Sequence, residues 1–374
     1  LHHHRSTALV SPNATLLPVS NLRVLAWMDG RPGDESQVRG LAACVPIPAT
    51  LHYATLPTPP PEALERRLGV WCLATKHLHM RPPAGLLEEL LGDQWPGIAA
   101  FKPQLSLAAG SRPGLYSFIL GRQEWCPTVQ AMTHGLLKTA FTLNVVPAHD
   151  RVPASEQVVV TRTAPNPFLP PVAHAEAMTF FRSTGLPAEQ PHWALLVGGL
   201  SKGQTLDAID IPAFVIEVQN WLRDAAEHKV KVLISTSRRT PAELTSALTP
   251  VLTDHPLVAW WQDFARDGAR TAGAFIGAAT QIFMSPDSVS MTSEALWAGR
   301  GVTLLPFKRS PQSQPVIDSP KHRRFVENLL SDGQVRWYGP SWTPPLARTD
   351  LEFRHPDYLA IQSAIRGVLR DVIS

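Results

Sequence analysis

Three short segments in the second half of the chain combine small residues with groups that bind anions. The first, Val197–Gln204 (VGGLSKGQ), offers two glycines, a serine and a lysine directly after an apolar run. The second, Ser235–Pro241 (STSRRTP), carries Arg238 and Arg239 just before a proline. The third, Asp287–Ala295 (DSVSMTSEA), has the hydroxyl side chains typical of a helix N-terminus. Helix N-termini, hydroxyls and cations all bind phosphate, so these segments predict an anion site.

The third segment is expected to open a helix whose first turn faces a phosphate. We predict that Ser290 is its N-cap. The backbone N–H groups of Met291, Thr292 and Ser293 would then lack partners within the helix and would face a pyrophosphate. Glu294, about one turn further, is placed to accept hydrogen bonds from a ribose diol. The alternative is an ordinary capped helix with an acidic first turn, which is a common feature.

The first segment also fits a second pattern. Gly199–Gly203 has the form Gly-x-Ser-x-Gly after a strand, which in α/β-hydrolases presents a nucleophilic serine, here Ser201. That arrangement requires a helix directly after the serine, whereas the next helix is expected only from about Pro212. The residue order of a P-loop is missing as well. A phosphate-binding loop that uses Lys202 is therefore the preferred interpretation, with a plain strand-to-helix connection as the other alternative.

A cluster of carboxylates lies near the start of the chain, in Asp29–Gln37 (DGRPGDESQ). It follows an apolar run that should be a strand, so it lies at a carboxyl strand end, where open α/β sheets bind ligands. Asp29, Asp34 or Glu35 could deprotonate a substrate hydroxyl if burial raises its pKa. Acids also stabilise a helix N-terminus, and this explains Asp34 and Glu35 nearly as well.

Metal-binding patterns are absent from the sequence. It has no Asp-x-Asp pair and no cluster of histidines, cysteines and carboxylates with metal-ligand spacing. We therefore expect no metal and no cofactor. Lys202, Arg238, Arg239 and helix dipoles would neutralise phosphate charge instead.

These segments need a scaffold, and the apolar pattern of the second half predicts one. Short apolar runs alternate there with amphipathic stretches. We expect strands at Trp193–Val197, Lys231–Ser235, Gln281–Met284 and Val302–Leu305, and helices at about Pro212–Glu227, Pro241–Leu252 and Ser290–Ala298. Strand–helix alternation with short connections predicts an α/β fold built on a doubly wound parallel sheet.

The first half is less regular. It opens with a strand at Leu22–Met28 and a helix from about Glu35 to Ala43, and Leu86–Leu91 should be helical. Further strands are expected at Tyr116–Leu120, Phe141–Pro147 and Val158–Val160, before a proline-rich linker candidate at Pro165–Pro171.

Length and composition indicate a soluble protein of two domains. The chain has 374 residues, 44% of them hydrophobic and 17% charged, and its net charge of +3 is too small to indicate nucleic-acid binding. No apolar run is long enough for a transmembrane helix, and three widely spaced cysteines favour a reducing cytoplasm. We expect a tag or disordered start over 1–20 and domains over 21–165 and 166–350. A last helix, at about Pro356–Ile373 within 351–374, would cross to the first domain.

The motifs together resemble a known family. The segments Asp29–Ala42 (DGRPGDESQVRGLA), Val145–Asp150 (VVPAHD), VGGLSKGQ with STSRRTP, and DSVSMTSEA are similar, in this order, to motifs of the "elongated mitochondria" family. That family comprises plant mitochondrial-fission proteins and bacterial relatives described as lipopolysaccharide or O-antigen glycosyltransferases. The resemblance spans nearly the whole chain, and its last two motifs are the most specific.

The resemblance implies a GT-B-like fold, in which two Rossmann-type domains face a cleft. The C-terminal domain would hold a nucleotide sugar and the N-terminal domain an acceptor, with Asp34, Glu35 or Asp29 as the catalytic base. For acceptor binding we expect Arg31, Gln37 and His149. For donor binding we expect Gly199, Ser201, Lys202, Gln204, Ser237, Arg238, Arg239, Asp287, Ser288, Ser290, Met291, Thr292, Ser293 and Glu294.

The activity implied is transfer of a sugar from a nucleotide-sugar donor to a lipid-linked or lipopolysaccharide-type acceptor, at the cytoplasmic face of a membrane. A carboxylate base suggests inversion at the sugar, and the missing metal-binding patterns suggest a reaction without a metal. The partners would include a glycolipid and an anionic membrane surface, but not nucleic acid. Two alternatives stay open: a GT-B scaffold without catalysis that recruits a fission dynamin, and a hydrolase that uses Ser201.

Overall fold

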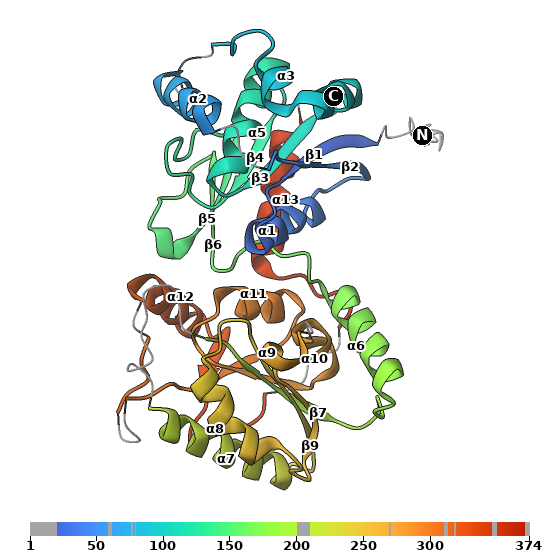
Figure 1. The fold of residues 1–374 in the computed structure, drawn as a ribbon, viewed down its shortest axis with the longest axis vertical. Helices are drawn as coiled ribbons and strands as arrows, with labels where there is room; N and C mark the ends of the chain where they lie inside the picture. Colours follow the sequence, from blue (N-terminus) through green and yellow to red (C-terminus); the bar gives the residue numbers. More distant parts are fainter. Residues whose placement is uncertain are drawn as a thin grey trace, which may run out of the picture.

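The chain forms two α/β domains, one above the other in Figure 1, and each is built on a six-stranded parallel sheet. The computed structural model describes residues 21–58, 62–75, 78, 80–199, 210–268, 271–309, 313–317, 319–345 and 350–370. The expected start over 1–20 lies outside the described residues.

The N-terminal sheet has the strand order β2-β1-β3-β4-β5-β6. Its strands are β1 (Leu22–Met28), β2 (Ala49–Thr55), β3 (Leu105–Ala109), β4 (Thr128–Ala131), β5 (Leu143–Pro147) and β6 (Val158–Thr161). The chain adds β2 on one side of β1 and then β3 on the other, so the order of strands reverses between β1 and β3. That reversal is the switch point at which such sheets bind ligands.

Helices cover both faces of this sheet, which explains why β1 is an almost continuous apolar run. The helices are α1 (Pro32–Ala43), α2 (Glu62–Thr75), α3 (Leu86–Leu91), α4 (Trp95–Phe101) and α5 (Ser111–Glu124). Alternate β1 side chains point to opposite faces. Val24 and Ala26 pack in the cluster that contains Leu41 of α1, whereas Leu25 and Trp27 pack in the cluster that contains α5.

The C-terminal sheet has the strand order β12-β11-β10-β7-β8-β9, which is that of a dinucleotide-binding Rossmann domain. Its switch point lies between β7 and β10. The strands are β7 (His192–Val197), β8 (Lys231–Thr236), β9 (Val258–Gln262), β10 (Gln281–Met284), β11 (Val302–Leu304) and β12 (Val335–Trp337). The helices are α6 (Pro170–Thr184), α7 (Ile211–Glu227), α8 (Ala242–Leu252), α9 (Phe264–Asp267), α10 (Ala272–Ala278), α11 (Val289–Trp297) and α12 (Pro320–Ser331).

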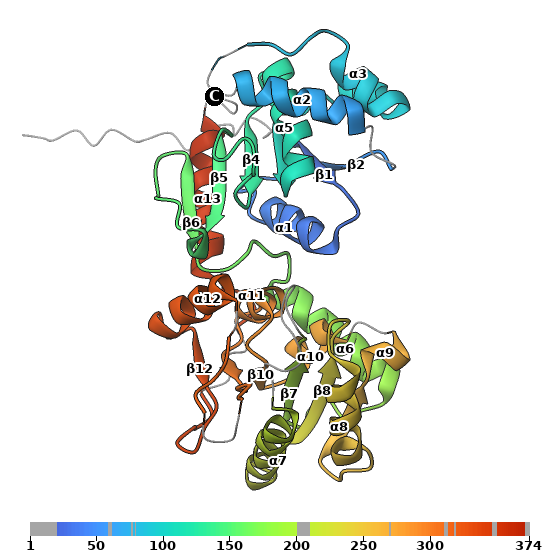
Figure 2. The same ribbon diagram turned by 60° about the vertical axis from the view of Figure 1, so that its left-hand side comes forward.

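The last helix, α13 (Pro356–Val368), returns from the C-terminal domain and lies along β5 and β6 (Figure 2). Ile361 and Ile365 are buried in the core of the N-terminal domain. At the start of the helix, the Asp357 carboxylate accepts hydrogen bonds from the N–H and the hydroxyl of Thr163, at 2.8 and 2.5 Å. The Trp297 indole of α11 donates to the same hydroxyl at 2.8 Å. The chain passes between the domains twice, near Thr163 and near Asp357, and these bonds join the two segments to each other and to α11.

The structure confirms the expected fold class, two doubly wound parallel sheets in a GT-B-like arrangement. The strand expected at Tyr116–Leu120 is wrong, because these residues lie inside α5. Phe118, Ile119 and Leu120 are consecutive apolar residues, and so short a run fits a buried strand and a buried helix equally well. Cys44, Cys72 and Cys126 are buried and free. Within the described part of the chain, no helix has the length and apolar composition needed to span a bilayer.

Candidate functional site

The switch point of the C-terminal sheet is closed by a buried carboxylate. Asp287 follows β10, and its Oδ2 accepts a hydrogen bond at 2.6 Å from the N–H of Gly199, which follows β7. Beside it, the Ser285 hydroxyl accepts a hydrogen bond at 2.7 Å from the N–H of Gly198. Burial raises the pKa of Asp287, and these polar neighbours together with Arg239 oppose that rise. Asp287 therefore holds the loop after β7 in place.

The two glycines after β7 leave no room for side chains. A Cβ on Gly198 would overlap the Asp287 carboxylate, and a Cβ on Gly199 would overlap the backbone carbonyl of Arg239. These glycines therefore allow the close approach of the neighbouring loops. The rest of that segment, including Ser201, Lys202 and Gln204, lies outside the described residues.

The loop after β8 is a compact polar turn. The N–H of Ser237 donates to Thr240 Oγ1 at 2.8 Å, and the N–H of Arg239 donates to Ser237 Oγ at 3.2 Å. Thr240 Oγ1 also donates to the carbonyl of Val197 at 3.0 Å, which fixes the turn against β7. The side chains of Arg238 and Arg239 remain exposed. The turn thus presents two cations at the carboxyl end of the sheet.

The helix after β10 begins two residues earlier than expected. The prediction that Ser290 is the N-cap is wrong: Ser288 caps α11, and its hydroxyl accepts from the N–H of Met291 at 3.3 Å. The N–H of Thr292 bonds the Ser288 carbonyl, so neither N–H faces a pyrophosphate. Val289 and Ser290 are the first residues of the helix, and the first N–H groups of a helix have no acceptor within it.

The helical period also turns two expected ligand residues inward. Thr292 and Ser293 are buried, and their hydroxyls donate to the carbonyls of Ser288 and Val289, each at 2.8 Å. Ser293 Oγ in addition accepts from the N–H of Ala164 in the interdomain linker, at 3.2 Å. The side chains of Thr292 and Ser293, like those of Asp287 and Ser288, therefore form hydrogen bonds within the protein, although all four were expected to bind the donor.

The outward face of α11 contributes to a pocket of about 350 Å³ between the domains, which we call the interdomain pocket. Met291 and Glu294 line one side, and the Ser290 hydroxyl donates to Glu294 Oε1 at 3.1 Å. The carboxyl end of β8 lines the next side with residues 235–238, which include Ser237 and Arg238. Ser36 of α1 lines the pocket from the N-terminal domain. Three predicted motifs therefore converge on one cavity.

Several further residues line the interdomain pocket but belong to none of the predicted motifs. Phe264 and Thr271 follow β9 and lie across from α11, and Phe168 and Glu176 come from the linker and α6. Burial raises the pKa of Glu176, whose carboxylate lies against Gly273. The sequence treated Pro165–Pro171 as a linker only, and α6 carries no motif that would have indicated a site.

The switch point of the N-terminal sheet carries the three candidate bases, and their surroundings differ. Asp29 is buried and accepts from the N–H of Arg31 at 3.1 Å. Glu35 accepts from the N–H of Gly30 at 3.0 Å. Asp34 accepts no hydrogen bond from another described residue, and Arg31 approaches it only to 4.0 Å. Burial and the nearby Asp29 carboxylate raise the pKa of Asp34, while Arg31 opposes the rise. Asp34 is therefore the carboxylate best placed to accept a proton.

The residues expected to bind an acceptor are not all brought together. Gln37 lies one turn after Asp34 on α1; its amide donates to Met132 at the end of β4, and its buried Oε1 has no partner among the described residues. Arg31 is exposed beside Asp34. His149 lies apart from them, packed edge-on against Phe325 of α12 at 5.9 Å. Burial and Lys321 lower the pKa of His149 to about 4. Its ring therefore belongs to the contact between the domains.

Metal ligands do not gather at this site. Among the residues that the structure describes, no three histidine, cysteine, aspartate or glutamate side chains come together as a metal site requires.

The sequence matches none of the curated proteins with which it was compared. In structure the chain is similar to MnaA of S. aureus bound to UDP, at 11% identity and a TM-score of 0.46, covering 94% of this chain and 97% of that one. It is also similar to a UDP-GlcNAc 2-epimerase from Methanocaldococcus jannaschii (11% identity, TM-score 0.48, 93% and 99% covered). A glycosyltransferase from Rickettsia africae is similar at 7% identity (TM-score 0.42, 95% and 95% covered).

A family model gives the most direct assignment. The model described as "Mitochondrial fission ELM1" matches residues 32–352, which is most of the chain. The matched range includes the last three motifs of the resemblance and most of the first, and it confirms that resemblance. The chain belongs to the mitochondrial fission ELM1 family.

Proposed function

We propose that the protein transfers a sugar from a nucleotide-sugar donor to a hydroxyl of a lipid-linked or lipopolysaccharide-type acceptor. The observation that carries this proposal is the interdomain pocket. It is shared by both domains, and it brings Glu294, Arg238 and Ser237 together at the carboxyl ends of the C-terminal strands. Open α/β sheets bind nucleotides at this position.

In this proposal the C-terminal domain holds the nucleotide. The free N–H groups at the start of α11 and the Arg238 guanidinium contact the diphosphate, because a helix N-terminus and a cation both stabilise negative charge there. The Glu294 carboxylate accepts hydrogen bonds from the ribose hydroxyls. Phe264 lies at the far wall and offers a ring on which a nucleobase can stack.

The N-terminal domain supplies the proton acceptor. Asp34 takes the proton from the acceptor hydroxyl while that oxygen bonds to the anomeric carbon of the sugar. The bond from this carbon to the diphosphate oxygen breaks, and the nucleoside diphosphate leaves with the electron pair. Attack from the face opposite the leaving group inverts the anomeric centre. Arg238, Arg239 and the helix dipole stabilise the charge that develops on the diphosphate.

Nucleotide binding tests the proposal directly. Purified full-length protein is titrated with UDP, GDP, ADP and CMP in a calorimeter, and its thermal unfolding is followed with each at saturation. One nucleotide is expected to stabilise the protein by about 2.7 kcal/mol at a hundredfold excess over its Kd. Glu294→Ala should weaken that nucleotide by roughly 10- to 100-fold, since it removes hydrogen bonds to a charged group.

A matched control is Glu227→Ala, because Glu227 is exposed at the far end of α7. This variant should bind the nucleotide as the parent does. If none of the nucleotides binds, the transferase proposal fails and the non-catalytic scaffold is favoured instead.

A further inference from the structure

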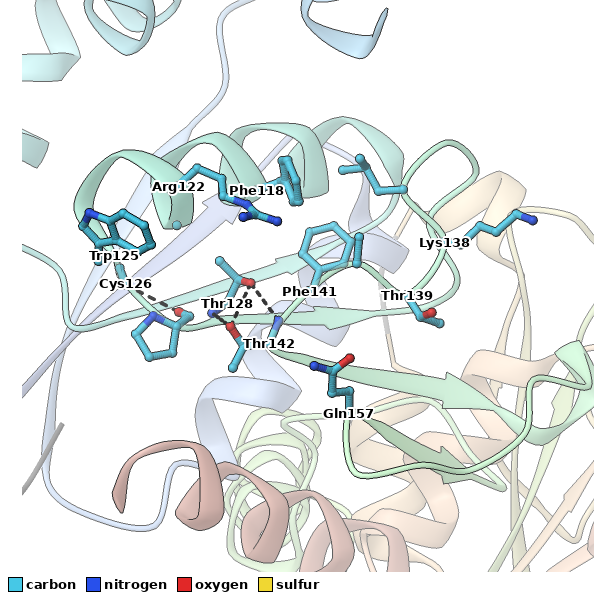
Figure 3. Close-up of a pocket in the computed structure, with 14 residues that line it drawn as sticks. Phe118, Arg122, Trp125, Cys126, Thr128, Lys138, Thr139, Phe141, Thr142 and Gln157 are labelled. Atoms are coloured by element: carbon cyan, nitrogen blue, oxygen red, sulfur yellow. Dashed lines mark hydrogen bonds between the residues drawn. The ribbon is translucent and has the colours of Figure 1, made fainter. Parts of the chain in front are cut away.

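A second and larger hollow lies in the N-terminal domain, away from the interdomain pocket. It has a volume of about 720 Å³ and lies between the second half of α5 and the chain that links β4 to β5 (Figure 3). Parallel strands are usually joined by a helix that covers the sheet. The connection over residues 132–142 contains no helix, so this part of the sheet face is left open. On the opposite face, α13 provides cover.

The lining of the hollow combines aromatic rings with a cation and hydroxyl groups. None of its 14 lining residues, all within the described chain, is acidic. The Arg122 guanidinium points into the hollow, 5.0 Å from the centre of the Phe118 ring (Figure 3). Thr128 and Thr142 lie below it and exchange hydrogen bonds with each other's N–H, both at 3.1 Å. These groups suit an anion that also carries apolar atoms.

Exposed apolar side chains lie at one end of the hollow and on α2, the helix that contacts α5. Trp125, at one end in Figure 3, is 57% exposed, and the Arg81 guanidinium lies 5.6 Å from its ring centre. Val70 and Leu73 are exposed three residues apart on α2, so they share one side of that helix. Exposed Leu136 lies beside them, since its Cδ1 is 3.3 Å from the position of a Cβ on Gly69. We call Val70, Leu73, Trp125 and Leu136 the apolar rim.

Cations accompany the apolar rim. On α2 the exposed residues in the turn directly before Val70 are Arg66 and Arg67, so the outward side of this helix is basic there and apolar from Val70 on. Lys138, exposed at the other end of the hollow, points away from its centre (Figure 3). An exposed tryptophan, aliphatic side chains and cations on one surface are the features of proteins that lie at the boundary between lipid headgroups and acyl chains.

We propose that this surface docks on an anionic phospholipid membrane. The apolar rim enters the headgroup–acyl boundary, Arg66, Arg67 and Lys138 face the negative headgroups, and one lipid phosphate occupies the hollow beside Arg122. This inference names the surface by which the protein would reach the lipid-linked acceptor of the proposed function, and it does not depend on sugar transfer. A soluble protein partner would fit the apolar rim alone, but it would not explain the hollow that lacks carboxylates.

Vesicle sedimentation tests the proposal. Full-length protein is mixed, without nucleotide, with vesicles of phosphatidylcholine or of phosphatidylcholine with about one third phosphatidylglycerol. Binding is expected to the anionic vesicles and to weaken as salt increases. Leu73→Ser and Trp125→Ala should each lower the partition constant by about tenfold, and Lys138→Gln by roughly fivefold. Arg122→Gln should reduce the preference for anionic over zwitterionic vesicles.

The chain offers matched controls for these changes. Ile216 on α7 is exposed to nearly the same extent as Leu73, 48% against 44%, so Ile216→Ser removes similar apolar surface elsewhere. Lys229 is exposed and has the same left-handed backbone as Lys138, with φ of 55° against 51°. Ile216→Ser and Lys229→Gln should leave binding unchanged, and thermal unfolding checks that every variant is folded.

Three results overturn the proposal. The first is no binding to anionic vesicles at low salt. The second is equal binding by the rim variants and their controls. The third is full competition by soluble glycerol phosphate, which would assign the hollow to a free phosphate compound. Because the assay contains no nucleotide, a protein that fails the nucleotide test can still pass this one, and the reverse also holds.

Discussion

The two sheets place a carboxylate at the same topological position, and the surroundings of the two carboxylates are opposite. Asp287 at the C-terminal switch point is buried and accepts the N–H of Gly199 at 2.6 Å. Asp34 at the N-terminal switch point lies against Gly110, after β3, and accepts no hydrogen bond from another described residue. Burial raises the pKa of both. The strand order thus places a carboxylate at the switch point of each sheet, whereas the burial and hydrogen bonding of the two carboxylates differ.

The two carboxylates differ in burial and in hydrogen bonding, and the proposed function gives them different roles. Asp287 Oδ2 accepts the N–H of Gly199, whereas its Oδ1 has no hydrogen-bond partner among the described residues. The side chain is 5% exposed, so burial, together with the bond to Gly199, fits it for holding the neighbouring loop. Asp34 is half-buried and accepts no hydrogen bond from another described residue, and its raised pKa strengthens it as a proton acceptor. Substitutions at the two positions should therefore affect different quantities.

The largest effect is expected from Asp34→Asn. If Asp34 accepts the proton, the amide should lower kcat by roughly 10²- to 10⁴-fold and leave nucleotide affinity unchanged. Because the folded-state pKa is raised, ionised Asp34 costs stability above the unfolded-state pKa, so the variant should unfold at the same or a higher temperature. In the parent, kcat/KM should fall with decreasing pH through the raised pKa. Unchanged turnover in the variant would return the role to Asp29 or Glu35.

A large loss of stability is expected from Gly199→Ala. The added methyl group would overlap the carbonyl of Arg239, which is backbone and belongs to a hydrogen-bonded turn. Overpacking of this kind costs about 1–3 kcal/mol or more in the free energy of unfolding, measured in urea. Gly97→Ala on α4 is the control, because nothing lies within 4 Å of its added Cβ. A Gly199→Ala variant as stable as this control would mean that the β8 loop moves freely.

Asp287 should show a smaller effect that depends on which group replaces it. Asp287→Ala leaves the N–H of Gly199 without an acceptor, which costs about 1–3 kcal/mol. Asp287→Asn keeps an accepting oxygen and removes a buried charge, so it should retain stability. The parent should lose stability as pH rises from the unfolded-state pKa through the raised folded-state pKa, because the folded state then holds more protons. The asparagine variant should lack this part of the pH dependence in urea unfolding at pH 4.5 and 7.5.

Four of the six strands of the C-terminal sheet could be predicted because they are separate apolar runs followed by turn residues, whereas β9 and β12 were missed. Gln281–Met284 is predicted to the residue, and helix α7 to within one residue. In the first half, β2 (ATLHYAT) lies at the edge of its sheet and is largely exposed, so it lacks an apolar signal. Helix α2 has the apolar residues Val70 and Leu73 on its exposed side, so its sequence does not show the separate apolar and polar faces by which a surface helix is recognised. Both elements were missed.

The candidate site could be predicted as a set of loops but not as a set of contacts. Parallel strand ends meet at one edge, so the convergence of the β8 loop and α11 follows from the sequence. Whether a hydroxyl faces ligand or protein depends on the helix start, and a shift of two residues turned Thr292 and Ser293 inward. Glu176 reaches the interdomain pocket because Gly273 makes room for it, a long-range contact that no local motif contains.

The smallest effect is expected at His149, which lies at the same edge of the sheet as Asp34. The prediction tests whether this histidine belongs to the contact between the domains or binds the acceptor. Its folded pKa of about 4 lies below the unfolded value, so between about pH 4 and 6.5 the unfolded state binds more protons and stability falls on acidification. His149→Gln should remove about 1–2 kcal/mol of that fall between pH 7 and 4.5 in urea unfolding. Exposed His228→Gln serves as the control. The acceptor KM should not change, because the ring packs against Phe325 of α12. A raised KM together with an unaltered pH dependence would instead place His149 in the acceptor site.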